Sequence, residues 1–231
     1  MRISVVIPVL NGARYLAQAL DSVMAQSRPV DEVVVVDGGS TDGSREIASG
    51  YPVVRLLTQS GRTGFAGAYD EGFTASTGDV ITGLDSDDYW TPRKIEWQAA
   101  LLESRPDVDY VIGKTRHFLE PGFDLPAGLR PEILDKDKTA PMPGTLMVRR
   151  HAFERVGPWS TGFTVAADID WFARAKDLLG PPATVDELLL HKRFHDDNLS
   201  LFHATALNSE LIRLLRQSVA RQSPAENENQ P

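Results

Sequence analysis

The sequence predicts an α/β protein with a mostly parallel, doubly wound, Rossmann-like central sheet flanked by helices. Apolar, β-branched runs alternate with segments of helical periodicity through the first 90 residues, as in a parallel sheet covered by helices. Two of the runs end in acidic loops, at Asp37 and at Asp85. Ligands of such sheets bind beyond the carboxyl ends of the strands, so both aspartates can face one crevice.

The first half of the chain follows this alternation closely. We expect strands over 3–9, 32–36 and 52–58, because short runs rich in Val, Ile or Leu are bounded there by turn residues. We expect helices over roughly 13–26 and 43–49, and a third around Tyr69 and Phe73, where apolar residues recur at helical spacing.

The stretch GDVITGLDSDDYW, residues 78–90, carries the strongest chemical signal. An apolar run leads there into Asp85, Asp87 and Asp88, with Ser86 as the only spacer. In an extended backbone Asp85 and Asp87 would project on the same side. Three adjacent carboxylates repel one another unless a cation lies among them. Their hard oxygen atoms suit Mg²⁺ or Mn²⁺, ions that often bridge the phosphates of a substrate.

A helix cap is the alternative explanation for part of this stretch. Asp88 or Thr91 could cap a helix that begins near Arg93, with Pro92 close to its first turn. A cap explains one of these side chains but neither Asp85 nor Asp87. We therefore favour a metal site, with which a cap is compatible.

The second half is less regular. We expect a helix over 94–104 with Trp97, Ala100 and Leu101 on one face, a short helix over 151–156, and strands over 110–112, 143–148 and 185–194. Residues 114–142, rich in Pro, Gly and charge, predict a long irregular excursion. Trp90 and Trp159 are expected in the core or at its rim.

Two more helices complete the prediction. The helix over 168–179 is expected to bury four residues, Ile169, Phe172, Ala173 and Leu178. A closing amphipathic helix over 203–218 places Leu207, Leu211, Leu214 and Leu215 on one side. That side can pack on its own domain or form a homodimer, and packing on its own domain is the commoner outcome.

Composition excludes several classes of protein. The formal net charge of −8 argues against a nucleic-acid-binding surface. The absence of cysteine excludes disulfides, a thiolate nucleophile and cysteine-ligated zinc. No apolar run approaches the roughly 20 residues of a transmembrane helix, and the N-terminal run is too short for a signal peptide. We expect a cytoplasmic protein without a transmembrane segment, with a disordered tail over 219–231.

Three further groups have both a structural and a functional interpretation. The loop over 37–44 can bind a ligand through its glycines, but taken alone it is a capped turn. Asp168 and Asp170 can be acids of a first helical turn, and Asp168 can instead be a general base. Alternation places His191, Arg193 and His195 on one face of a strand, either at a solvated edge or beside a diphosphate.

The order of these motifs resembles the inverting nucleotide-sugar glycosyltransferases of family 2, which have the GT-A fold. The resemblance covers roughly residues 1–202, from VVIPVLNGARYL through VVVDGGSTDGS, GLDSDDYWTPRKIEWQ and GTLMVRRHAFERVG to ADIDWFARA and RFHDDNLS. Each motif alone is weak, and their order and spacing make the match specific. Residues 114–142 match least.

The resemblance implies a role for each matching position. Pro8, Asn11 and Asp37 would line the nucleotide pocket, where Asp37 would recognise the base, usually uracil. Asp85, with Ser86 beside it, and Asp87 fall on the metal-binding acidic motif, and Asp87 is the expected direct ligand. Asp168 matches the catalytic base, and His195 matches a late histidine that contacts the metal or the diphosphate.

Two positions depart from the family pattern. The usual Ala-Arg-Asn run before the acidic motif is Ala68, Tyr69 and Asp70 here, and Arg62 is a candidate to replace the missing arginine in nucleotide binding. The usual Glu-Asp pair is Ala167-Asp168, which keeps the base and loses its neighbour.

The resemblance implies a single GT-A domain over 1–218. Its nucleotide-sugar half would span 1–112, its acceptor and catalytic half 113–202, and the closing helix 203–218. The expected reaction is Mn²⁺- or Mg²⁺-dependent transfer from a UDP-hexose or UDP-N-acetylhexosamine to a hydroxyl of a glycan, lipid-linked or protein acceptor. Two alternatives are a nucleotidyltransferase, although 9–13 lack the Lys or Arg of a triphosphate loop, and a non-catalytic nucleotide-sugar-binding protein.

Overall fold

The computed structural model describes residues 1–61, 64–125, 129–198 and 204–222. Within these residues the strands form one nine-stranded sheet in the order β3-β2-β1-β4-β8-β6-β9-β5, and β7 pairs with β6. Strands β3, β2, β1 and β4 are parallel, β8 is antiparallel to both β4 and β6, and β9 runs parallel to β6. The α/β prediction with a mostly parallel first half is therefore confirmed.

The elements of the first half lie close to the predicted ranges. They are β1 (Ile3–Val9), α1 (Leu16–Met24), β2 (Glu32–Asp37), α2 (Ser44–Ser49), β3 (Val54–Thr58), α3 (Gly64–Ala75) and β4 (Val80–Gly83). Helix α1 begins three residues later than the predicted 13, because residues 13–15 form a turn before it.

The second half differs more from the prediction. It contains β5 (Tyr89–Trp90), α4 (Lys94–Ser104), β6 (Tyr110–Leu119), α5 (Glu132–Asp135), β7 (Lys138–Thr139), η1 (Pro143–Thr145), β8 (Met147–Arg149), α6 (Arg150–Val156), α7 (Ala167–Leu179), β9 (Ala183–Phe194) and α9 (Ala204–Gln222). The predicted irregular excursion over 114–142 thus includes the second half of β6, a short helix and β7. Residues 143–145 form a 3-10 turn instead of the start of a strand.

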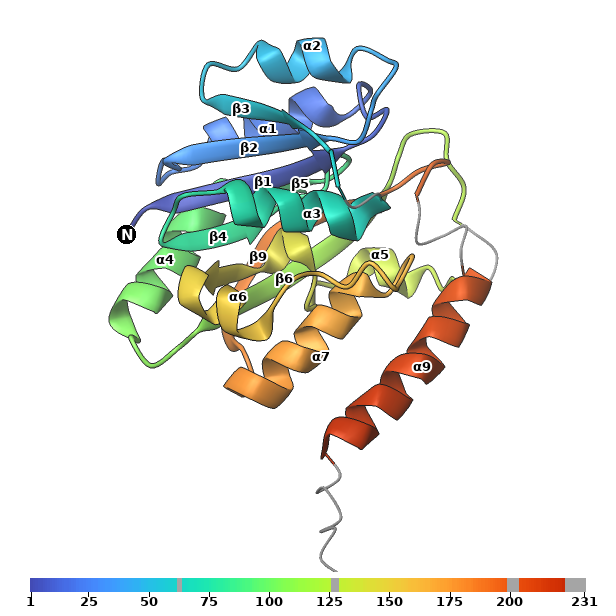
Figure 1. Ribbon diagram of the computed structural model, residues 1–231. Helices are drawn as coiled ribbons and strands as arrows, with labels where there is room; N and C mark the ends of the chain where they lie inside the picture. Colours follow the sequence, from blue (N-terminus) through green and yellow to red (C-terminus); the bar gives the residue numbers. More distant parts are fainter. Residues whose placement is uncertain (62–63, 126–128, 199–203, 223–231) are drawn as a thin grey trace, which may run out of the picture.

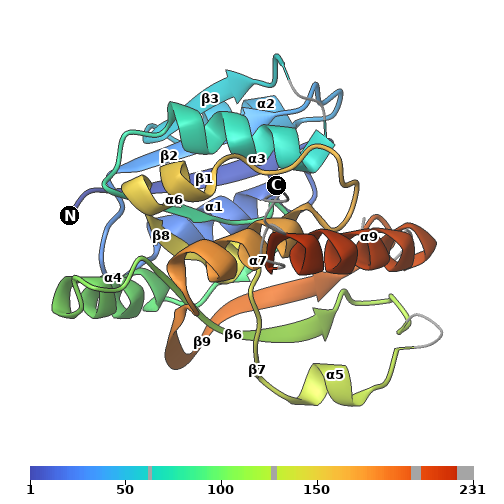
Figure 2. The same ribbon diagram turned by 60° about the horizontal axis from the view of Figure 1, so that its bottom comes forward.

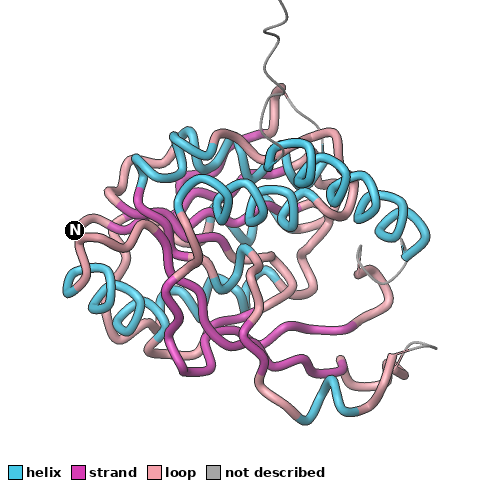
Figure 3. Tube along the Cα trace, turned by 90° about the horizontal axis from the view of Figure 1, so that it is seen from below, coloured by secondary structure: helices cyan, strands magenta, loops and turns pink. Residues whose placement is uncertain are grey.

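The sheet has a hydrophobic core on each face. On β1, Val5 and Ile7 pack with α1 and α4, while Val6 packs on the other face with α3, α6 and α7. This division follows from the alternation of side chains along a strand. Figures 1 and 3 show the strands running between helices on either side.

The closing helix packs on its own domain. Leu214 is buried against the same core as α7, and Leu207 and Leu211 pack partly buried beside it. Figures 1 and 2 show α9 beside α7. The prediction was wrong for Leu215, which is 66% exposed. The predicted boundary at 218 falls inside α9, and the part of the predicted tail over 223–231 lies outside the described residues.

Two helices bury residues that were not predicted. In α4 the fully buried apolar residues are Ile95, Ala99 and Leu102; of the predicted face, Trp97 and Leu101 pack partly buried against the same core and Ala100 is exposed. In α7 the predicted Ile169 and Leu178 are exposed by 39% and 51%. The inward residues there are Ala167, Trp171, Phe172 and Ala175, so only Phe172 of the four predicted residues is fully buried. A short amphipathic stretch can offer two alternative apolar faces, and the tertiary packing determines which of them is buried.

No helix in the described ranges combines the length and the apolar character needed to cross a lipid bilayer.

Lys94 is an ionisable residue inside the core. Its side chain is fully buried, its Nζ lies 2.7 Å from Thr82 Oγ1, and the same atom lies 4.0 Å from the centroid of the Trp90 ring. No carboxylate is recorded beside it among the described residues. Burial lowers the pKa of Lys94 well below its usual value.

We predict that Lys94→Met weakens the pH dependence of stability. Between the lowered folded pKa and the unfolded value near 10.4, only the unfolded chain binds this proton, so stability contributed by Lys94 falls as pH falls through that window. Removing the group should remove a slope of up to roughly 1.4 kcal/mol per pH unit. Urea unfolding of both proteins at pH 7 and pH 9 measures the free energy of unfolding. If this free energy changed equally with pH in the wild type and the variant, a neutral buried Lys94 would be contradicted.

Candidate active site

The three aspartates of the acidic stretch lie on a turn at the carboxyl end of β4. The strand ends at Gly83, and the amide of Asp88 donates a hydrogen bond to the carbonyl of Asp85 at 3.2 Å. The prediction that Asp85 and Asp87 project from an extended backbone was therefore wrong. The turn still gathers the acids, because Asp85, Asp87 and Asp88 each offer a carboxylate oxygen within 4.8 Å of the others.

The acids do not cap the following helix. Asp88 accepts a hydrogen bond from the backbone N–H of Arg193 at 2.8 Å, and the Thr91 hydroxyl donates to the carbonyl of Leu188 at 2.7 Å. Helix α4 has no side-chain cap. Both predicted caps are instead used to join the acidic turn and β5 to β9.

Asp85 and Asp88 share the ammonium of Lys192. Its Nζ lies 3.4 Å from Asp85 Oδ2 and 3.3 Å from Asp88 Oδ2. The buried Tyr69 hydroxyl donates to Asp85 Oδ1 at 2.8 Å. Tyr69 stands where the family pattern has an arginine. It still contacts the acidic group, but through the hydrogen bond of an uncharged hydroxyl.

Asp87 has a separate set of partners. His195 Nε2 lies 2.9 Å from Asp87 Oδ2, and the Asn198 amide donates to the same oxygen at 3.1 Å. The backbone N–H of Asp197 donates to His195 Nδ1 at 3.1 Å. Because Nδ1 accepts, the hydrogen of the neutral ring lies on Nε2 and is donated to Asp87, so ligation of a metal by Nε2 would require this hydrogen to leave.

Burial and crowding shift the pKa values of the acidic group. Burial and the neighbouring carboxylates, against the opposing charge of Lys192, raise the pKa of Asp88 to about 8. Burial also raises the pKa of Asp85. For Asp87 burial acts in the same direction, but the hydrogen bond from His195 and the charge of Lys192 lower its pKa overall. Burial disfavours the charged form of Lys192, and the carboxylates outweigh it and raise its pKa.

The residues present fit a hard divalent cation. Three carboxylate oxygens lie within 4.8 Å of one another, and the Nε2 atom of His195 lies 2.9 Å from the Oδ2 atom of Asp87. Oxygen ligands with one imidazole suit Mn²⁺ or Mg²⁺. With all groups ionised, Lys192 offsets one of the three negative charges, so the pocket keeps an excess that favours a cation.

The basic residue that meets the acids is one that the sequence prediction missed. The contacts agree with the prediction that His191, Arg193 and His195 share one side: His191 and Arg193 both lie against the Phe118 ring, and Arg193 and His195 both lie against the Tyr15 ring. Arg193 is buried and pairs with Glu120. The pairing of β6 with β9 is regular from Thr115 and Leu190 onward, so alternation turns Lys192 to the other side, where it meets Asp85 and Asp88.

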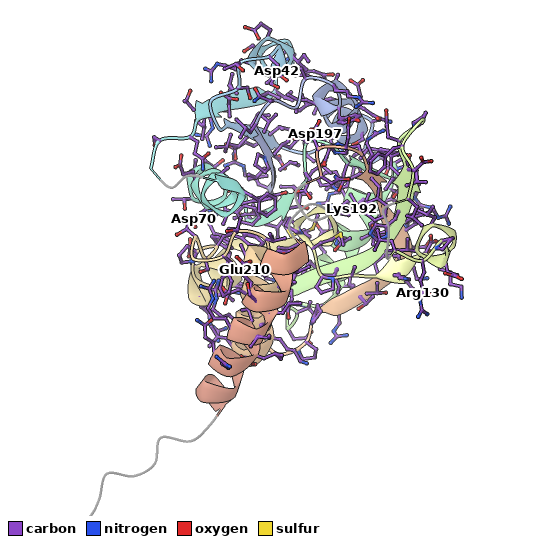
Figure 4. The ribbon with its side chains drawn as sticks, turned by 90° about the vertical axis from the view of Figure 1, so that its right-hand side faces the viewer. Asp42, Asp70, Arg130, Lys192, Asp197 and Glu210 are labelled. Atoms are coloured by element: carbon purple, nitrogen blue, oxygen red, sulfur yellow. The ribbon has the colours of Figure 1, made fainter. Side chains whose placement is uncertain are left out.

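Lys192 lies centrally on the side of the molecule that faces the viewer in Figure 4. Figure 4 shows it below Asp197 and above Glu210. Its position directly before Arg193 and His195, in the run HKRFH, is the one sequence signal that could have identified it.

Asn11 and Asp37 hold two loops together at the carboxyl ends of β1 and β2. Asn11, at φ 52°, accepts a hydrogen bond from the Thr41 amide at 2.8 Å. The buried Asp37 carboxylate accepts from the Ser40 amide at 3.0 Å and from Arg45 at 2.6 Å. Burial opposes ionisation, but these hydrogen bonds lower the pKa of Asp37 overall.

The other predicted nucleotide-pocket residues lie nearby or outside the described ranges. Pro8 is buried in β1 and pairs with Val36 of β2. Ser86 lies on the acidic turn, where its hydroxyl approaches the loop at Gly12. Arg62 lies outside the described residues.

Asp168 and Asp170 have different surroundings. Asp170 is buried and pairs with Arg174 at 2.8 Å, which makes it a structural acid of α7. Asp168 lies in the first turn of α7 and is only partly buried, and it accepts a hydrogen bond from the Ile169 amide at 2.8 Å. Burial, together with the charge of Asp85, raises the pKa of Asp168 to about 6. Asp168 therefore differs from Asp170 in having a raised pKa and no ion-pair partner among the described residues, which suits it for the role of a base better than Asp170.

The fold and the acidic turn define a nucleotide-sugar glycosyltransferase of the GT-A class. The family model for glycosyl transferase family 2 matches residues 4–157, and the chain belongs to this family. It is 30% identical to a glycosyltransferase of Nostoc sp. over 91% of this chain and 70% of the relative. It is 28% identical to glycosyltransferase AglE of Haloferax volcanii over 76% of this chain and 61% of that relative.

Solved structures share the fold at lower identity. The structure of S. aureus TarS 1-349 in complex with UDP-GlcNAc is 18% identical, with a TM-score of 0.74, over 98% of this chain and 68% of that chain. Glucosyl-3-phosphoglycerate synthase from Mycobacterium tuberculosis, in complex with Mn²⁺ and UDP-glucose, is 24% identical, with a TM-score of 0.68, over 94% of this chain and 78% of that chain. Family membership separates the chain from nucleotidyltransferases and from non-catalytic binding proteins.

We predict that Lys192→Met destabilises the protein and increases its response to Mn²⁺. The substitution leaves Asp85 and Asp88 without their shared ammonium, and breaking a largely buried ion pair costs roughly 2–4 kcal/mol. Added Mn²⁺ should then raise the melting temperature of the variant more than that of the wild type, because the cation replaces the lost charge. Lys176→Met, at an exposed position of α7, is the control, and equal Mn²⁺ responses in all three proteins would contradict this role of Lys192.

Proposed function

We propose that the protein is a metal-dependent, inverting glycosyltransferase that moves a sugar from a UDP-hexose or UDP-N-acetylhexosamine to an acceptor hydroxyl. The acceptor would be a polysaccharide, a glycolipid or a protein. The observation that carries the proposal is the acidic turn, where Asp85, Asp87 and Asp88 each offer a carboxylate oxygen within 4.8 Å of the others. This turn would serve the diphosphate, and Asp168, in the first turn of α7, would serve the acceptor.

Asp168 suits the role of general base. A pKa of about 6 leaves it ionised at neutral pH, and still more basic than an ordinary aspartate. Such a group can take the proton of the acceptor hydroxyl as that oxygen attacks the anomeric carbon of the donor sugar. The carbon–oxygen bond to the nucleoside diphosphate breaks in the same displacement, so the anomeric configuration inverts.

Asp85, Asp87 and His195 are the proposed ligands of Mn²⁺ or Mg²⁺. When bound, the ion supplies positive charge that stabilises the departing nucleoside diphosphate. Lys192 adds a protein cation at the same place, and the Tyr69 hydroxyl keeps Asp85 oriented.

Residues at the carboxyl ends of β1 and β2 are proposed to bind the nucleotide. Asn11 and Asp37 fix the shape of the two loops, and Pro8 and Ser86 lie at their borders. Loop and strand ends at this edge of a parallel sheet are the usual place for a nucleotide. The choice of UDP rests on the family resemblance and on the UDP-sugar complexes of TarS and of the glucosyl-3-phosphoglycerate synthase.

We predict that Asp168→Asn lowers the transfer rate by roughly 10²- to 10⁴-fold, because general-base help is lost. The donor is first chosen as the nucleotide sugar that raises the melting temperature in the presence of Mn²⁺. Donor binding by Asp168→Asn, measured in the same way, should equal that of the wild type. Wild-type turnover in this variant would remove Asp168 from the role of base.

The pH dependence of turnover provides an independent check. Because Asp168 must be ionised to accept a proton and its pKa is about 6, kcat should fall about tenfold per pH unit below pH 6. The measurement is kcat between pH 4.5 and 8 with saturating donor. A rate that stays flat down to pH 5 would contradict an Asp168 base with a raised pKa.

A further inference from the structure

Glu210 of α9 reaches across to the segment that precedes α7. Its Oε1 accepts a hydrogen bond from the Thr164 amide at 2.7 Å, and its Oε2 accepts from the amides of Val165 and Ala166 at 3.0 and 2.9 Å. One carboxylate therefore binds three successive backbone N–H groups. Figure 4 shows Glu210 where α9 meets the body of the domain.

These three N–H groups have a particular place in the fold. Ala166 is the N-cap residue of α7, and that helix has no side-chain cap of its own. The first N–H groups of a helix lack partners within it, and a negative charge there is favoured by the helix dipole. Two of the three N–H groups, those of Thr164 and Val165, precede the helix, and that of Ala166 belongs to its N-cap residue. Glu210, 44 residues later in the chain than Ala166, supplies the acceptor and a negative charge. Burial opposes its ionisation, but the three hydrogen bonds lower the pKa of Glu210 overall.

A second side chain of α9 holds the same segment. Arg213 donates a hydrogen bond to the carbonyl of Gly162, and its guanidinium lies 4.0 Å from the centroid of the Phe163 ring. With Glu210, α9 contacts the segment from 162 to 166. The apolar side of α9 fixes the helix, because Leu211 and Leu214 pack against the core next to α7.

Asp168 follows this segment by two residues. It lies in the first turn of α7, so the position of its carboxylate depends on the position of residues 164–166. We propose that Glu210 is a positioning residue, which holds the start of α7 so that Asp168 stays aligned with the acidic turn. The inference rests on the proposed role of Asp168 as base.

A merely structural role for Glu210 makes a different prediction. It would lower stability and leave kcat of the folded protein unchanged. A positioning role lowers kcat while leaving donor binding intact, because the nucleotide loops and the acidic turn lie on other elements. Misplacement of a catalytic group by about 1 Å costs up to roughly 100-fold in rate.

The test compares Glu210→Gln and Glu210→Ala with the wild type. Glutamine offers one acceptor oxygen in place of two, so we expect kcat to fall by roughly tenfold, and by up to about 100-fold for alanine. The KM and the thermal shift for the donor should stay within about twofold of wild type. Gln217→Ala, an exposed position of the same helix, is the control and should leave kcat unchanged.

Combining the substitutions shows whether Glu210 acts through Asp168. In an Asp168→Asn background, Glu210→Gln should cause little further loss, because residues that act as a unit are not additive. A full additional loss, or wild-type kcat in a folded Glu210→Gln protein, would overturn the inference. If Asp168→Asn keeps wild-type turnover, the proposed role of Asp168 as the base is contradicted, regardless of the kcat of the Glu210 variants. Where Glu210→Ala does not fold, Glu210→Gln decides.

Discussion

The structure around the candidate site depends on the repulsion among Asp85, Asp87 and Asp88 and on the groups that offset it. A single short turn holds the three carboxylates within 4.8 Å of one another. Their partners come from the end of β9, where Lys192 meets two of the acids and His195 meets the third. The end of β4 is thereby joined to an element about 100 residues later in the chain. The same charges that create this constraint would favour a cation bound among them, as proposed for the site.

The two parts of the sheet contribute different residues to the candidate site. The parallel strands β1, β2 and β4 end at one edge, and their loops carry Asn11, Asp37 and the acidic turn. The antiparallel β8 and the long pair β6 and β9 extend the sheet beyond β4 and bring Lys192 back to that edge. Helix α7, on one face, adds Asp168. In the proposed reaction the donor and the acceptor would thus be handled by different elements, the strand ends and α7.

The two departures from the family pattern fit into this arrangement without disrupting it. Tyr69 packs fully buried against Trp159 and still donates a hydrogen bond to Asp85, while the positive charge next to the acids comes from Lys192. Ala167 is 1% exposed in the core, so the missing acid leaves no unfilled polar position there. At the start of α7, Glu210 adds a negative charge from outside that helix to those of Asp168 and Asp170 in its first turn.

The sequence by itself determined the alternating strands and helices of the first half, and it placed Asp37 and Asp85 at strand ends. The spacing of apolar residues along the chain reflects which side of an element is buried. A short apolar run between turn residues has few favourable conformations other than a strand. Only the tertiary structure decided that the acids lie on a turn and that the ammonium of Lys192 meets Asp85 and Asp88. The pairing of β6 with β9 sets where the end of β9 lies relative to that turn, and no local pattern encodes it. The contact of Glu210 with the start of α7 likewise depends on how two helices pack, which the sequence of neither helix specifies.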